Sequence, residues 1–283
     1  PRGEFGMSKT HKTAHLTLVY ILLTVGAVIM LMPFYYMLST SVKAPEELYV
    51  NRLVWFPSKI VWRNYADAWN EEPYFPRYFF NSAFIATVTT ALQLATSALA
   101  AYAFSNIDFW GKETVFMILL GTMMIPSQVT LVPNYAIIAR LGWIDTYKAL
   151  IVPFTASVFG IFMMRQFFQT VPLEMWDAAQ IDGCSRFRYL WAVMVPLARP
   201  IFVTSGLFTF IGGWNSFLWP LIVTNSDHLR TIQVGLSRFN QEFGTRPDLL
   251  MAASTLAIAP LVALFFVAQN QFIQGIARTG LKS

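Results

Sequence analysis

Residues 170–200 read TVPLEMWDAAQIDGCSRFRYLWAVMVPLARP and lie between two apolar runs of membrane-spanning length. Pro172 suits the first turn of a helix, where its missing N–H costs nothing. Gly183 permits the left-handed conformation that ends a helix, and Ser185 can cap a second helix that we expect to end before Pro196. The stretch therefore predicts a helix–turn–helix insert held at a membrane surface.

The chain on both sides of this insert is too apolar for an ordinary soluble protein. Of its 283 residues, 55% are hydrophobic and only 12% are charged. The hydrophobic residues form continuous runs, and roughly 20 such residues cross about 30 Å of hydrocarbon as a helix. We therefore predict an all-α polytopic membrane protein with six spans. These are Leu16–Leu38, Asn81–Phe104, Thr114–Pro133, Ala149–Phe168, Pro200–Ile222 and Leu249–Gln269.

The third span and the orientation are the least determined parts of this arrangement. Pro126 and Pro133 interrupt the third span, which neighbouring helices can accommodate by satisfying the freed carbonyl groups. An even number of spans places both termini on one side, but the lysines and arginines divide equally between the two sides. The charges therefore do not choose the cytoplasmic side. Residues 1–6, which precede Met7, are expected to be a cloning remnant.

The insert resembles the Glu-Ala-Ala loop of permease subunits in ABC importers. That loop has Glu-Ala-Ala, then a glycine, then Ile-x-Leu-Pro. The matching residues here are Asp177-Ala178-Ala179, Gly183 and Val193–Pro196, at the same spacing. The exchanges of aspartate for glutamate and of valine for isoleucine and leucine conserve charge or shape. The resemblance covers nearly everything from Pro33 to Lys282. The other segments similar to carbohydrate-type importer permeases are 126–129, 141–147, 165–168 and 212–220.

This resemblance implies a type I ABC importer permease in a bacterial inner membrane, with both termini in the cytoplasm. Its implied parts are a cytoplasmic N-terminus (7–15), a six-span permease domain (16–270) with an outer loop (39–80) and a cytoplasmic coupling loop (170–199), and a cytoplasmic tail (271–283). In that family the coupling loop docks in a cleft of the ATP-hydrolysing subunit and transmits its motion to the membrane helices. The residues implied in docking are Glu174, Trp176, Asp177, Ala178, Ala179, Asp182, Gly183, Arg186 and Phe187.

The resemblance also implies the partners. They are a second, related permease, two ATPase subunits that hold ATP and Mg²⁺, an extracytoplasmic solute-binding protein and the lipid bilayer. The chain itself is expected to bind no cofactor or metal, because it has no G-x-x-x-x-G-K-[ST] loop, a single cysteine and no closely spaced histidine pair in a span. Its lysines and arginines form no basic stripe, so the net charge of +5 does not indicate nucleic-acid binding.

The residue types of the insert are those of a docking surface. Leu173, Trp176, Phe187, Leu190 and Trp191 offer an apolar knob, and charged residues on both helices rim it. The alternative is that these apolar side chains pack against the permease's own helix ends. Residue types alone do not separate the two interpretations, and the resemblance favours docking.

Polar and aromatic residues inside the predicted spans indicate where a solute passes. Gln93 lies in a span rich in small and hydroxyl residues, and an amide in hydrocarbon needs a partner or a water-filled cavity. Trp214 and Asn215 follow a glycine pair, and such residues suit the C–H faces and hydroxyls of a sugar. Trp214 and Trp219 can instead anchor at the outer interface. Arg165, near the end of a span, is expected to snorkel to the cytoplasmic interface.

The resemblance implies an oligosaccharide, a uronide oligomer or glycerol-3-phosphate as the solute, and the lack of a mid-span arginine disfavours a strongly anionic one. A stand-alone secondary carrier is a different class of function, but the predicted spans hold no carboxylate for proton coupling. A membrane-embedded enzyme would need converging catalytic groups, which the sequence does not indicate. We therefore expect a transport subunit that takes its energy from a partner.

Overall fold

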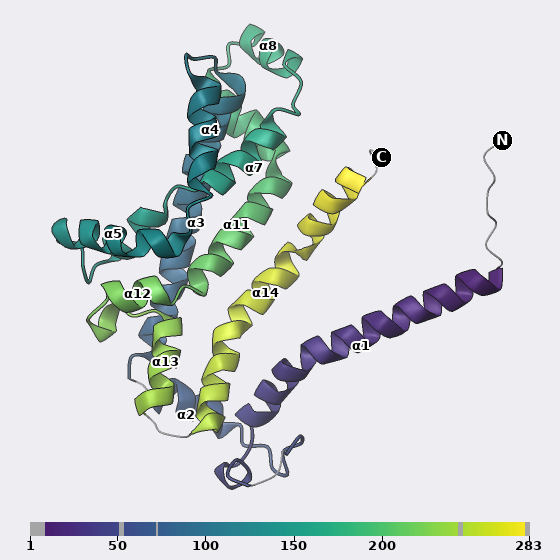
Figure 1. Cartoon of the computed structure of the whole chain (residues 1–283), viewed down its shortest axis with the longest axis vertical. Coiled ribbons are helices and arrows are strands. Elements are labelled where there is room, and N and C mark those ends of the chain that lie inside the picture. Colours follow the sequence, from purple (N-terminus) through teal and green to yellow (C-terminus); the bar gives the residue numbers. More distant parts are fainter. Residues whose placement is uncertain (1–8, 51–53, 72, 243–245, 281–283) are drawn as a thin grey trace. The chain divides into compact units, whose positions relative to one another are not determined.

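The computed structural model describes residues 9–50, 54–71, 73–242 and 246–280, and these are helical or irregular with no strand (Figure 1). The chain divides into two units, one of residues 1–71 and 242–256 and one of residues 72–241 and 257–283. Four helices are long and apolar enough to cross a membrane, and up to six spans result if each of two bent pairs counts as one. The predicted cloning remnant at 1–6 lies outside the described residues.

The first unit begins with α1 (Lys9–Ser41), which contains the first predicted span. Two short helices follow, η1 (Pro45–Glu47) and α2 (Arg63–Glu71). Lys43, between α1 and η1, is buried and donates from Nζ to the carbonyl of Val54 at 2.5 Å, so this segment is folded around an internal cation. The predicted loop 39–80 overlaps the segment between α1, which runs to Ser41, and the next long helix, which begins at Phe75.

The second unit is organised around α3 (Phe75–Asn106), which packs against α7 (Val158–Phe168) and α11 (Arg199–Trp214). Small residues allow this close approach: a Cβ on Gly213 would lie 3.4 Å from the Cα of Ala86. With about 1.5 Å of rise per residue, α3 extends over some 48 Å, long enough to cross a bilayer. The predicted role of small residues as packing surfaces is therefore confirmed at this contact.

The third predicted span, Thr114–Pro133, is broken next to the first of the two prolines that interrupt it in the sequence. The segment forms α4 (Lys112–Thr122) and α5 (Ser127–Arg140), whose axes differ by 98°. Pro126 separates them, with an extended ψ of 134°. A proline disfavours helical geometry in the residue before it and supplies no N–H, so the helix ends and the chain changes direction.

The fourth and fifth spans are also interrupted. The fourth consists of α6 (Tyr147–Ile151), η2 (Val152–Phe154) and α7, which together are long enough to cross a membrane. The predicted fifth span reached Ile222, but α11 ends at Trp214 and α12 (Leu218–Val223) follows after a break. The remaining helices are η4 (Asp227–Leu229), α13 (Ile232–Glu242) and α14 (Pro247–Gly280), and α14 contains the sixth predicted span.

Candidate functional site

The insert forms the predicted helix–turn–helix, and α8 lies at one end of the second unit, away from α12 and α13 (Figure 1). Helix α8 (Glu174–Ile181) is followed by Asp182 and then by Gly183, whose φ of +72° suits a residue without a side chain. The N–H groups of Gly183 and Cys184 donate to the carbonyls of Gln180 and Ala179, at 3.0 and 2.9 Å. These paired bonds are a Schellman termination, which fixes the turn.

The second helix of the insert does not end before Pro196 as expected. Ser185 caps α9 (Arg186–Tyr189), accepting from the N–H of Arg188 at 3.3 Å. The helix then widens into the π-helical turn η3 (Leu190–Met194) and continues as α10 (Val195–Leu197). The wider turn accommodates the proline, which cannot donate and would crowd a carbonyl in regular α-helix.

The second helix of the insert is anchored in the core of the bundle. Tyr189, Leu190 and Met194 are buried in a cluster with residues of α3 and α7. The ring of Trp176 is half-buried and lies 5.1 Å from that of Tyr189, edge to face. The guanidinium of Arg186 also lies over the Trp176 ring, 5.9 Å from its centroid. Leu190 is 1% exposed and packs inside its own bundle, so its predicted place in an exposed knob is wrong, whereas half-buried Trp176 packs against the same cluster and keeps part of its surface exposed.

Other apolar side chains of the insert remain exposed. Leu173, Phe187 and Ile181 have exposed fractions of 68%, 67% and 88%. Ile181 was missed in the sequence, although an isoleucine next to the charged turn was the available signal. The predicted contact residues that are exposed around them are Glu174, Asp177, Ala178, Asp182, Gly183 and Arg186, while Ala179 is half-buried. The insert thus presents exposed apolar side chains together with exposed charged ones.

The prediction that Arg165 snorkels to the interface is wrong. Its residue is 7% exposed, and its Nε donates to the carbonyl of Phe104 at 3.1 Å. Nη2 lies 2.8 Å from Oε1 of Glu113, and the guanidinium lies 4.1 Å from the ring centroid of Phe116. Arg165 thus connects the last turn of α7, which leads into the insert, to the C-terminal end of α3 and the first turn of α4.

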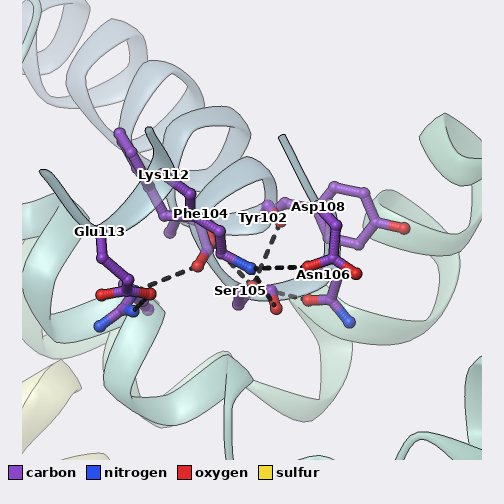
Figure 2. A network of polar contacts seen from close by, with 9 residues as sticks. Tyr102, Phe104, Ser105, Asn106, Asp108, Lys112 and Glu113 are labelled. Atoms are coloured by element: carbon purple, nitrogen blue, oxygen red, sulfur yellow. Dashed lines mark hydrogen bonds and ion pairs between the residues drawn. The ribbon is translucent and has the colours of Figure 1, made fainter. Parts of the chain in front are cut away.

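The loop that joins α3 to α4 adds further polar contacts to this tie (Figure 2). The Oγ of Ser105 donates to the carbonyl of Ala101 at 2.8 Å and contacts Oδ1 of Asn106 at 2.6 Å. Nζ of Lys112 lies 3.5 Å from both the Ser105 carbonyl and Oδ1 of Asp108. The α3–α4 junction is therefore held by hydrogen bonds on the side where the insert is attached.

A cavity of about 340 Å³ lies inside the second unit, between α3, α11 and the segments around α6 and α12. Its polar lining residues are Thr89, Gln93, Thr209, Ser216 and Thr231, and its aromatic ones are Phe154, Phe159, Phe208 and Trp219. No lysine, arginine, aspartate or glutamate is among the described residues that line it. The cavity wall is thus mainly apolar and uncharged, with a few hydroxyl groups and one amide among its lining residues.

Only one of the three predicted pathway residues reaches this cavity. Gln93 lines it, whereas Trp214 and Asn215 do not. Trp214 is buried and donates from Nε1 to the carbonyl of Ala257 at 3.0 Å, and exposed Asn215 accepts from Gln233 at 3.2 Å. Trp219 lines the cavity and donates to a buried carbonyl, so it is an internal residue and not an interface anchor.

Two threonines in the cavity wall were not predicted. Thr89 is 6% exposed and Thr231 is 3% exposed, and neither hydroxyl has a hydrogen-bond partner among the described residues. Leaving a buried hydroxyl unpaired costs about 1–3 kcal/mol. Thr89 belongs to the predicted span rich in small and hydroxyl residues but was not singled out, and Thr231 carried no sequence signal.

The comparisons with known proteins assign the chain to a family. Residues 93–278 match the binding-protein-dependent transport system inner membrane component family. The chain belongs to this family. It is therefore the permease subunit of an ABC importer, a membrane transport component and not an enzyme.

Its relatives include permeases with different solutes. The chain is 34% identical to the probable ABC transporter permease protein YurM of Bacillus subtilis, over 94% of this chain and 88% of YurM. It is 33% identical to the arabinooligosaccharides transport system permease protein AraQ of the same organism, over 94% of this chain and 95% of AraQ. The sn-glycerol-3-phosphate transport system permease protein UgpE of Yersinia enterocolitica is 30% identical, over 91% of this chain and 94% of UgpE.

The fold is that of a solved importer. A chain in the crystal structure of a bacterial ABC transporter involved in the import of the acidic polysaccharide alginate matches with a TM-score of 0.85. The match covers 95% of this chain and 99% of that chain, at 22% sequence identity. The predicted fold class, an all-α importer permease, is therefore confirmed.

Proposed function

We propose that this permease forms half of the translocation path for an uncharged, carbohydrate-class solute and receives energy from ATPase subunits through residues 170–199. The observation that carries the coupling is the exposure of Leu173, Ile181 and Phe187 on a helix pair whose other side is anchored in the bundle. Exposed apolar side chains together with exposed charged ones suit a protein partner. The rigid anchor would transmit movement of that partner into α3 and α7.

The proposed assembly follows from this role. A second permease completes the path, two ATPase subunits bind ATP and Mg²⁺, and an extracytoplasmic binding protein delivers the solute. The insert then faces the cytoplasm, and an even number of spans places both termini there as well. A structure of the bacterial alginate transporter in complex with a periplasmic protein bound to an alginate pentasaccharide provides a precedent for such an assembly.

The uncharged cavity favours a neutral sugar over a phosphate ester. Glycerol-3-phosphate, the solute in the name of one relative, carries negative charge that arginine, lysine or backbone N–H groups usually bind. The cavity instead offers hydroxyls, one amide and aromatic rings. Arabinooligosaccharides, named for another relative, need groups of this kind.

The proposal is tested by uptake in proteoliposomes that contain the assembled importer. Wild-type importer should take up arabinotriose only with ATP and the binding protein. Gly183→Val should leave binding-protein capture intact but separate ATP hydrolysis from uptake, because a β-branched residue distorts the left-handed turn at φ +72°. Gly142→Val is the matched control, since Gly142 has a φ of +67° and also has open space around it but lies outside the insert.

Two results would contradict the proposal. Uptake by the permease alone, without ATPase subunits, would indicate a secondary carrier. If Gly183→Val and Gly142→Val reduced ATP-coupled uptake equally, the insert would have no special part in energy transfer.

A further inference from the structure

Helix α4 is attached to the bundle at the place where Arg165 lies. The structure describes all residues of α4, and of these only Phe116 is buried. Phe116 packs in a small apolar cluster with Phe104 of α3 and Ile161 of α7. The guanidinium of Arg165 lies 4.1 Å from the Phe116 ring centroid, and its Nη2 lies 2.8 Å from Oε1 of Glu113 in the first turn of α4. Arg165 therefore contacts α4 at its one buried ring and at its first turn.

The same arginine lies on the helix that leads into the insert. Phe168 follows Arg165 by one helical turn on α7 and is 1% exposed, in the cluster that contains Tyr189 and Leu190 of the insert. One short helix thus has a contact with the insert and, one turn away, a contact with α4. A short helix moves as a unit, so a displacement of the insert that shifts Phe168 also shifts the guanidinium of Arg165.

Helix α4 is one half of a broken span, and the other half lines a cavity. The axes of α4 and α5 differ by 98° at the break 123–126. Helix α5 contributes Ser127, Leu131 and Asn134 to the wall of a cavity of about 370 Å³, which Ser216 and Phe217 from the break between α11 and α12 also line. A few residues between two helices can absorb a change of angle, as hinges do. A shift of α4 can therefore reorient α5 and change this wall.

We propose that Arg165 is a positioning residue for energy coupling, which carries movement of the insert to α4 and thereby to the broken span. The inference rests on the proposed function and deepens it, because the insert then acts on α4 and α5 as well as on α3 and α7. A guanidinium suits this role, since its planar fork binds the Phe104 carbonyl and the Glu113 carboxylate at once, in a fixed geometry.

The experiment compares three variants of the full importer in proteoliposomes, with the binding protein present. Arg165→Met removes the polar contacts, and Arg165→Lys keeps the positive charge without the fork. Gly235→Ala is the matched control, because its new Cβ would overlap the Tyr78 ring and strain the same unit at residues that Arg165 does not contact. A variant that only folds less well loses ATP hydrolysis and uptake in proportion, so the ratio of the two rates separates coupling from stability.

The measured quantity is the number of ATP molecules hydrolysed per molecule of arabinotriose taken up. Arg165→Met should raise this ratio by about three- to tenfold, and Arg165→Lys, which can keep one of the two polar contacts, by about twofold. Gly235→Ala should leave the ratio unchanged. A wild-type ratio in Arg165→Met would overturn the proposal. If Arg165→Met does not assemble, a wild-type ratio in Arg165→Lys would overturn it in the same way.

A second measurement follows the broken span directly. Met124, which lies between α4 and α5 and is 85% exposed, is replaced by a fluorescent amino acid. Trapping the importer with ATP and vanadate should shift the emission of this residue when Arg165 is present, and the shift should be smaller in Arg165→Lys. Equal shifts in the two proteins, or no shift in either, would overturn the proposal.

The failure of this inference and the failure of the proposed function give different results. ATP-dependent uptake of arabinotriose with the same ratio and the same emission shift in all variants would refute the role of Arg165 and leave the proposed function standing. An importer with Arg165 present that takes up no arabinotriose with ATP and the binding protein would instead refute the proposed function.

Discussion

The buried arginine at the root of the insert allows a quantitative prediction. Arg165→Met keeps an unbranched side chain of similar length but removes every polar contact of the guanidinium. The lost bond to the Phe104 carbonyl is charge-assisted and worth about 2 kcal/mol, and the contact with the Phe116 ring about 1 kcal/mol. We therefore expect the free energy of unfolding to fall by about 3 kcal/mol.

The ion pair itself contributes less. The side chain of Glu113 is 65% exposed, so water screens its attraction to Arg165 although the atoms lie 2.8 Å apart. Glu113→Gln should lower the free energy of unfolding by about 1 kcal/mol. The loss caused by Arg165→Met should differ by no more than about 1 kcal/mol between the wild-type background and the Glu113→Gln background. The carbonyl and the ring, and not the carboxylate, then account for most of the arginine's effect.

The assay is unfolding of the purified permease in mixed detergent micelles, followed by circular dichroism. Arg140→Met is the control, because Arg140 is an exposed arginine in the last turn of α5 and should change stability by less than about 0.5 kcal/mol. A loss below about 1 kcal/mol for Arg165→Met, or a larger loss for Glu113→Gln than for Arg165→Met, would refute the reasoning.

Two further predictions concern the second unit. Gly235→Ala should destabilise the protein by about 2 kcal/mol, because the new Cβ would lie 2.3 Å from the ring of Tyr78. Gly26→Ala, in open space, should not destabilise it in the same unfolding assay, and equal effects of the two would contradict the packing. The pKa of the Asp145 carboxyl is lowered below its ordinary value. Burial alone would raise this pKa, but the hydrogen bonds that the carboxylate accepts from residues 225–226 outweigh burial. A lowered folded pKa means that this carboxylate stabilises the protein at neutral pH and that the stabilisation is lost as pH falls below about 4. The difference in unfolding midpoint between wild type and Asp145→Asn should therefore shrink between pH 7 and pH 3, and a difference that grows on acidification would contradict the assignment.

The sequence predicted those elements whose cause is local. Continuous apolar runs predicted α1, α3 and the central part of α14, because hydrophobic length is the main determinant of a membrane span. Gly183 and Ser185 predicted the turn of the insert, since a left-handed residue and a cap act on their immediate neighbours. Such features need no knowledge of which helices pack together.

The features that the sequence did not predict depend on tertiary contacts. Arg165 near a span end suggested snorkelling, but a carbonyl from α3 and a carboxylate from α4 provide an internal site for its charge. Trp176 is half-buried because its ring packs against that of Tyr189 from the second insert helix. Thr231 joins the cavity only because the bundle brings it beside α3. Periodicity and composition contain no record of these partners.

The most direct test of the account is photocrosslinking from the insert in the assembled importer. Phe187 is replaced by p-benzoylphenylalanine, and Phe56, which is 75% exposed in the segment between η1 and α2, is replaced in the same way as a control. Illumination at Phe187 should produce an adduct with the ATPase subunit, and illumination at Phe56 should not. An adduct of Phe187 with the solute-binding protein, or none with any partner, would contradict the claim that this insert receives the energy of ATP hydrolysis.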